Sequence, residues 1–197
     1  MDKRKTLIIG EVYIDQHLDI KENGVCTSRL GGIFHAARSC EALGMEYALA
    51  YYAPSYLEKD IKKFGKDVLG ASNAYCLGNV DKAPNVILVG ESDESGNQLY
   101  ENILCEQAEY ISRLPLKQVL DDFKPTDIVI FPGRYDNVKI LSNLSDYDGK
   151  IYIDMNYDSD DIINLDIIKI QTVFLSTSST SFEKFFKEQS YDSILQW

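Results

Sequence analysis

The chain has 197 residues, of which 45% are hydrophobic and 26% charged, so its composition is that of a soluble globular protein and excludes a fibrous or wholly disordered chain. Its formal net charge of -11 would repel polyanions, which argues against binding to nucleic acid or to an anionic membrane. A chain of this length can bury a substantial core, and we expect one domain that spans residues 1–197.

The chain begins with MDKRKTLIIGEVYID, in which basic residues precede an apolar run. Glu11 and Asp15 interrupt that run, so it is too short for a signal peptide or a membrane span and predicts a first β-strand instead. We therefore expect a cytoplasmic protein. The four cysteines are widely spaced and the chain has only two histidines, a pattern that indicates free thiols and neither a disulfide framework nor a zinc site.

Short apolar segments alternate with helical patterns along most of the chain. Strands are predicted at residues 6–14, 47–52, 127–131, 150–153 and 172–175. Helices are predicted at residues 35–43, 57–64, 115–122, 137–144 and 181–187. Strands that alternate with helices are typical of a parallel sheet that is covered on both faces.

Residues 72–104 interrupt this alternation, because they contain two or three strand-like runs with no helical period between them. Ser95 and Gly96 have the composition of a hairpin turn. Together with residues 24–30, these runs predict a small antiparallel flap, or lid, of the kind that commonly covers a ligand site. The predicted fold class is α/β: a mostly parallel, Rossmann-like sheet with helices on both faces and a small antiparallel β flap.

The strongest local signal is an acidic residue at the end of the first predicted strand, followed by a glycine pair before a helix. A glycine pair permits positive φ and lets a ligand approach the backbone, and Asp15 stands where open α/β sheets place ligand-contacting side chains. A carboxylate at that position can accept two hydrogen bonds from a vicinal diol. Alternatively, Gly31 and Gly32 make only a tight turn and Asp15 is a solvated strand-end acid.

The order of motifs resembles the ribokinase-like (PfkB family) sugar and nucleoside kinases over essentially the whole chain. GEVYID is followed by GG, by a helix that closes on ALG, by the strand YALAYYA and by the helix YLEKDIKKFG. FPGRYDN is similar to the strand-Gly-helix step of that family, and YIDMNYDSD is similar to its Asp-x-Asn strand end. VFLSTSSTSFEKFF stands where the family has an Asn-x-x-Glu motif. The resemblance implies a ribokinase-like fold.

The same resemblance implies which residues bind a substrate. Asp15 matches the acid of the family that binds substrate hydroxyls, and Gly31 and Gly32 match the glycine pair that lines the same pocket. His35 stands where the family usually has an asparagine, with the preceding loop one residue shorter. His35 could offer a hydrogen bond to a ligand hydroxyl, or it could be a helix N-terminal histidine without a ligand.

ATP and Mg²⁺ are cofactors that only the resemblance implies. The positions expected near the nucleotide are Asp154, Asn156, Ser176 and Ser179. Ser176 and Ser179 replace the Asn and Glu of the family motif, and hydroxyls are poor replacements for a carboxylate near Mg²⁺. The Gly-Ala-Gly-Asp motif that carries the catalytic base of the family does not occur in the sequence. We therefore assign no catalytic residue and no metal ligand.

Two functional hypotheses follow. The chain is the sugar- or nucleoside-binding portion of a kinase that phosphorylates a sugar hydroxyl in a longer protein, or it is an inactive binding or regulatory protein with a degenerate kinase fold. An unrelated Rossmann-like protein is disfavoured, because Glu11 stands where a phosphate-binding Gly-x-Gly-x-x-Gly motif would begin. The expected partner is a small sugar or nucleoside, and exposed strand edges of the flap could pair two chains in a homodimer.

Overall fold

The computed structural model describes residues 4–19, 25–81, 86–92, 98–103, 109–133, 135, 137–154 and 170–174. The predicted helix at residues 181–187 lies outside the described residues. No helix in the described part of the chain is long and apolar enough to cross a membrane.

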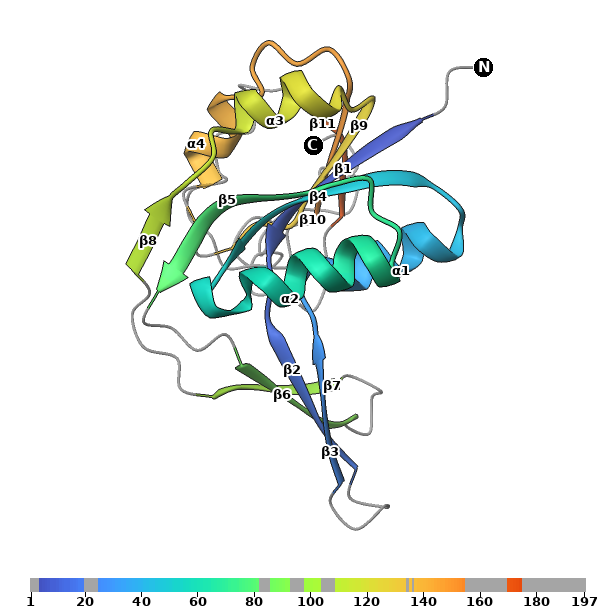
Figure 1. Ribbon diagram of the computed structural model, residues 1–197, viewed down its shortest axis with the longest axis vertical. Coiled ribbons are helices and arrows are strands. Elements are labelled where there is room, and N and C mark those ends of the chain that lie inside the picture. The colour runs from blue at the N-terminus through green and yellow to red at the C-terminus, as the bar shows by residue number, and fades with distance from the viewer. Residues whose placement is uncertain are drawn as a thin grey trace, which may run out of the picture.

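The main sheet has seven strands in the spatial order β11-β10-β9-β1-β4-β5-β8 (Figure 1). All neighbouring pairs are parallel except β5 and β8, which are antiparallel. The strands are β1 (Lys5–Glu11), β4 (Glu46–Ala53), β5 (Ala74–Asp81), β8 (Glu109–Ser112), β9 (Asp127–Ile130), β10 (Lys150–Asp154) and β11 (Ile170–Phe174).

Helices cover both faces of this sheet, with α1 and α2 on one side and α3 and α4 on the other (Figure 1). They are α1 (Ile33–Ala42), α2 (Glu58–Lys63), α3 (Leu116–Phe123) and α4 (Asn137–Ser142). A 3₁₀ turn (Ser55–Leu57) precedes α2, and a π-helical turn (Phe64–Val68) follows it. The helices predicted at residues 35–43, 57–64, 115–122 and 137–144 are therefore present, and their boundaries differ from the prediction by a few residues.

Burial on both faces explains why the central strands are continuous apolar runs. In β1, Leu7 and Ile9 pack into the core beneath α3 and α4, while Ile8 packs into the core beneath α1. All three side chains are fully buried. Because successive side chains of a strand point to opposite faces, a strand covered on both faces favours apolar residues on both faces.

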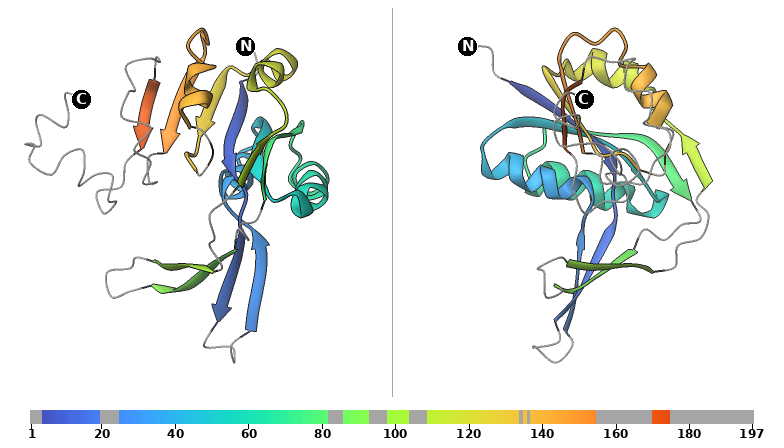
Figure 2. Two further views of the ribbon diagram at one scale, coloured as in Figure 1. Left: turned by 90° about the vertical axis from the view of Figure 1, so that its left-hand side faces the viewer. Right: turned by 180° about the vertical axis from the view of Figure 1, so that it is seen from behind.

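A second, four-stranded sheet in the order β3-β2-β6-β7 extends beyond one end of the main sheet (Figure 2). We call this sheet the flap; its strands are β2 (Ile14–Asp19), β3 (Val25–Leu30), β6 (Val86–Ser92) and β7 (Gln98–Ile103). β2 pairs antiparallel with β3, β6 pairs antiparallel with β7, and the β2–β6 pair is parallel. The predicted fold class, a mostly parallel sheet with helices on both faces and a small antiparallel flap, is confirmed.

The chain leaves the main sheet earlier than the sequence predicts. β1 ends at Glu11, whereas the predicted first strand runs to residue 14. Val12 donates from its backbone to Tyr52 at 2.9 Å, and the carbonyl of Tyr13 accepts from the backbone of Gly31 at 2.8 Å. The next strand, β2, belongs to the flap. Because Val12, Tyr13 and Ile14 are apolar and include no turn residue, the sequence between Glu11 and Asp15 has no local signal for the change of sheet.

The first strand-like run of residues 72–104 also differs from its expected place. β5 pairs in parallel with β4 in the main sheet, and only β6 and β7 of this region belong to the flap. Both faces of a strand in the main sheet are covered, yet a short run such as AYCLGNV has the same composition as a half-buried flap strand. Which sheet the run joins depends on the strand with which it pairs, and composition does not encode that partner.

The structure predicts low reactivity for two cysteines. Cys40 and Cys76 are free thiols, and burial raises the pKa of both. Because the thiolate is the reactive form, we expect iodoacetamide to modify both more slowly at neutral pH in the folded chain than in urea. Modification should accelerate as the pH rises toward the raised pKa values. Mass spectrometry of the two peptides measures this, and equal rates with and without urea would contradict it.

Candidate ligand-binding site

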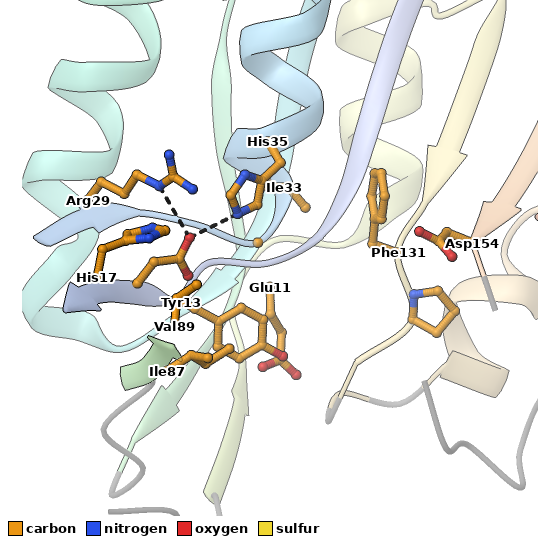
Figure 3. Close-up of a pocket in the computed structure, with 13 residues that line it drawn as sticks. Glu11, Tyr13, His17, Arg29, Ile33, His35, Ile87, Val89, Phe131 and Asp154 are labelled. Atoms are coloured by element: carbon orange, nitrogen blue, oxygen red, sulfur yellow. Dashed lines mark hydrogen bonds and ion pairs between the residues drawn. The ribbon is translucent and has the colours of Figure 1, made fainter. Parts of the chain in front are cut away.

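A cavity of about 490 Å³ lies between the flap and the carboxyl ends of strands β1, β9 and β10 (Figure 3). This volume is typical of a small-molecule site, and the carboxyl edge is where open α/β sheets bind ligands. Flap residues in its wall are Asp15, His17, Arg29, Ile87 and Val89. The other lining residues are Glu11, Tyr13, Gly32, Ile33, His35, Phe131, Pro132 and Asp154.

The flap brings its cavity residues together through strand register. Asp15 lies opposite Arg29 of β3 on one side and opposite Ile87 of β6 on the other. His17, two residues further along β2, lies opposite Val89. Side chains two residues apart share one face of a strand, so Asp15 and His17 both line the cavity.

Asp15 lies among the polar side chains at one end of this cavity and is buried, with only 4% of its surface exposed. Its Oδ2 lies 2.9 Å from Nε2 of His35 and 3.6 Å from Nε of Arg29. Both partners are about half exposed, while the carboxylate that they contact is not. The two contacts hold the carboxylate in one orientation, with Arg29, His17 and His35 gathered on this side of the cavity (Figure 3).

Packing explains the glycine pair at the start of α1. A Cβ atom on Gly31 would overlap the carboxylate of Asp15, so that carboxylate packs directly against the backbone of Gly31. Gly32 has φ 60° and ψ −128°, and a Cβ atom there would overlap the carbonyl oxygen of Glu11. Both glycines are therefore required by close approach, and Gly32 also by its backbone conformation.

Acidic residues lie at the main-sheet end of the cavity. Glu11 ends β1 and is 2% exposed, and Asp154 ends β10. The loop after β9 approaches Glu11 closely, since a Cβ atom on Gly133 would lie 2.7 Å from Glu11 Oε1. Asn137 braces that loop, because its Nδ2 donates to the carbonyl of Gly133 at 3.0 Å and its Oδ1 accepts from the backbone of Gly133 at 3.3 Å.

The structure brings the four predicted substrate-binding residues to one place. Asp15, Gly32 and His35 line the cavity, and Gly31 packs against the carboxylate of Asp15. Asp15, however, lies within a flap strand and not at the end of the first strand. Asp154, predicted near the nucleotide, lines the same cavity. The other three residues predicted near the nucleotide lie outside the described residues: Asn156, Ser176 and Ser179.

Sequence reasoning missed His17 and Arg29, which the flap register adds to the site. His17 could have been found by its period-two spacing from Asp15, but only once β2 was recognised as a strand of its own. Its Nε2 is buried and has no hydrogen-bond partner in the part of the chain that the structure describes. Both histidines of the chain thus line this one cavity.

The described residues include only part of the region where the resemblance implies Mg²⁺ and ATP. They contain no group of three or more His, Cys, Asp or Glu side chains arranged to hold a metal ion. Mg²⁺ in kinases is bound by one or two carboxylates together with substrate phosphates, and Asp154 is the one described residue among those predicted near the nucleotide. No phosphoryl-transfer step is therefore assigned to these residues.

Solved structures share this architecture, although no family model and no curated protein matches the sequence. A microbiome-derived acarbose kinase superposes with a TM-score of 0.60 at 13% identity, over 89% of this chain and 62% of its own length. A pyrophosphate-dependent kinase in the ribokinase family superposes with a TM-score of 0.52 at 14% identity, over 76% of this chain and 49% of its own length.

The chain thus has the ribokinase-like fold, as the order of its sequence motifs predicts. It spans 62% and 49% of the lengths of these two kinases.

Proposed function

We propose that the chain is the substrate-binding portion of a ribokinase-like small-molecule kinase and that it binds a sugar or a nucleoside between the flap and the main sheet. One observation carries the proposal: a buried carboxylate, that of Asp15, is held by two side chains against the backbone of Gly31 inside a cavity of about 490 Å³. A buried acid oriented in this way is suited to accept hydrogen bonds from ligand hydroxyls.

The remaining wall of the cavity suits the same ligand class. Ile33, Ile87, Val89 and Phe131 present apolar surface to the cavity, against which the C–H face of a sugar ring or a nucleobase can pack. The ring nitrogens of His35 and His17 offer polar contacts near Asp15. Polar groups at one end and apolar walls elsewhere would fix the orientation of a small polyhydroxylated molecule.

The complete protein would transfer the γ-phosphoryl group of ATP to a ligand hydroxyl. The fold supports this reaction class, since the structures with this fold include a kinase named for the carbohydrate acarbose. In phosphoryl transfer most of the catalytic effect comes from positioning and from electrostatic stabilisation of the phosphate oxygens. Within this reaction, the residues described here would bind and orient the acceptor.

An inactive binding or regulatory protein is the second candidate function. Ser176 and Ser179 favour it, because they replace an amide and a carboxylate within the chain. Hydroxyls alone would hold Mg²⁺ less well than a carboxylate does. In this case the sugar or nucleoside would be sensed or retained without being phosphorylated. The cytoplasmic location and the homodimer paired through flap strands stay predictions under both candidates.

Isothermal titration calorimetry of the chain against a panel of sugars, polyols, sugar acids and nucleosides tests the binding proposal. We expect saturable binding of at least one compound. Failure to bind any of them would overturn it. For a compound that binds, ADP release with ATP and Mg²⁺ separates the candidates: turnover by the complete gene product supports the kinase, and binding without turnover supports the inactive protein.

A further inference from the structure

A second cavity, of about 410 Å³, lies where β3 meets α1 and α2. Three cationic side chains line it: Arg29 from β3, Arg38 from α1 and Lys63 from the end of α2. One acid, Asp60, also lines it. The wall is therefore predominantly cationic in a chain whose formal net charge is -11.

Arg38 is held in place but is incompletely paired. Its Nη2 donates to the carbonyl of Leu30 at 2.8 Å, and its guanidinium lies 5.8 Å from the ring centroid of Phe64. Its Nη1 is buried and has no hydrogen-bond partner among the described residues. A guanidinium carries five N–H donors, so the fixed side chain retains hydrogen-bonding capacity that none of the described protein groups uses.

The charges around Arg38 favour an anion. Burial lowers the pKa of Arg38, and the neighbouring charge of Arg29 lowers it further, while Asp15 opposes the effect. Neither Arg38 nor Lys63 forms an ion pair with any carboxylate of the described residues. Nε of Arg29 lies 3.6 Å from Oδ2 of Asp15, so the uncompensated positive charge of the cavity rests chiefly on Arg38 and Lys63, and a bound anion would offset it.

We infer that this second cavity binds the phosphate group of a small molecule. Arginine guanidinium groups match phosphate oxygens with paired donors, and a lysine ammonium adds a point charge, so these side chains together suit a dianion better than a neutral ligand. The inference does not depend on the sugar or nucleoside proposed for the first cavity. Among the described lining residues, the two cavities have the side chain of Arg29 alone in common.

Calorimetric titration with inorganic phosphate and with glycerol phosphate, each against sodium chloride at matched ionic strength, tests the inference. We expect saturable binding of a phosphate compound that chloride does not reproduce. The comparison also identifies the source of the group, because a site for phosphate esters would bind glycerol phosphate more tightly, and a site for the free ion would prefer inorganic phosphate.

Lys63→Gln locates the binding, with Lys59→Gln as its matched control. Both lysines are exposed residues of α2, but only Lys63 lines the cavity, so both variants should fold. We expect Lys63→Gln to weaken phosphate binding about tenfold, as for the loss of one charge-assisted contact, and Lys59→Gln to change it less than about twofold. Equal effects of the two substitutions, or binding that chloride reproduces, would overturn the inference. Neither outcome bears on sugar binding.

Discussion

Asp15→Asn is expected to weaken binding of the sugar or nucleoside about 100-fold. The substitution keeps the size of the side chain but removes the charge and one acceptor oxygen. Hydrogen bonds to a charged group contribute about 1.5–3 kcal/mol each, and the loss of about 2.7 kcal/mol corresponds to that factor. Calorimetry with the tightest compound of the panel measures the effect.

Asp146→Asn is the matched control, because Asp146 is an exposed acid in the turn after α4 and does not line the cavity. It should bind the ligand as the unmodified chain does. Asp15 also contacts His35 and Arg29, so circular dichroism should first establish that Asp15→Asn is folded. A folded Asp15→Asn that binds as tightly as the control would show that this carboxylate does not contact the ligand.

Gly32→Ala should lower the free energy of unfolding by about 3 kcal/mol or more. Gly32 adopts φ 60° and ψ −128°, a conformation that is strained for any residue with a side chain. Strain of this kind costs about 1–3 kcal/mol, and the overlap of the new methyl group with the carbonyl oxygen of Glu11 adds a similar amount. Urea unfolding with linear extrapolation measures the change.

Gly44→Ala is the comparison for positive φ without steric overlap. Gly44 also has positive φ, 63°, but a Cβ atom there would meet nothing within 4 Å. This substitution should therefore cost only the backbone strain, about 1–2 kcal/mol. If Gly32→Ala costs no more than Gly44→Ala, the close approach of Gly32 to the carbonyl oxygen of Glu11 does not constrain the start of α1.

The central strands and the helices that cover them could be predicted because their signals are local. β4 consists of the residues EYALAYYA, of which all but the first are buried, and α3 follows Pro115 with its buried residues at helical spacing. Strand burial on both faces and helix burial on one stripe leave different apolar periods in the sequence. The ends of strands and helices are harder to predict from sequence, because they depend on hydrogen bonds to other segments.

The site could be predicted only where a residue stands next to a strong local signal. His35 follows a glycine pair at the start of a helix, and its 2.9 Å contact with Asp15 joins two residues that the sequence already singles out. Arg29 and Val89 have no such signal. They reach the cavity because β3 and β6 pair with β2 in a particular register, and register depends on contacts between residues distant in the sequence.

The sequence by itself determined the α/β class and the order of the main strands and helices, since these rest on local periodicity. It also singled out Asp15, Gly31 and Gly32 as candidate binding residues, from an acid near a strand end and the conformational freedom of a glycine pair. Only the tertiary structure decided that β2 leaves the main sheet for the flap and that β5 stays in the main sheet. It also brought His17, Arg29 and Asp154 to one cavity. These features depend on which strands pair with each other. Strand pairing in turn depends on backbone hydrogen bonds and on burial across the whole chain, which a local sequence pattern does not contain.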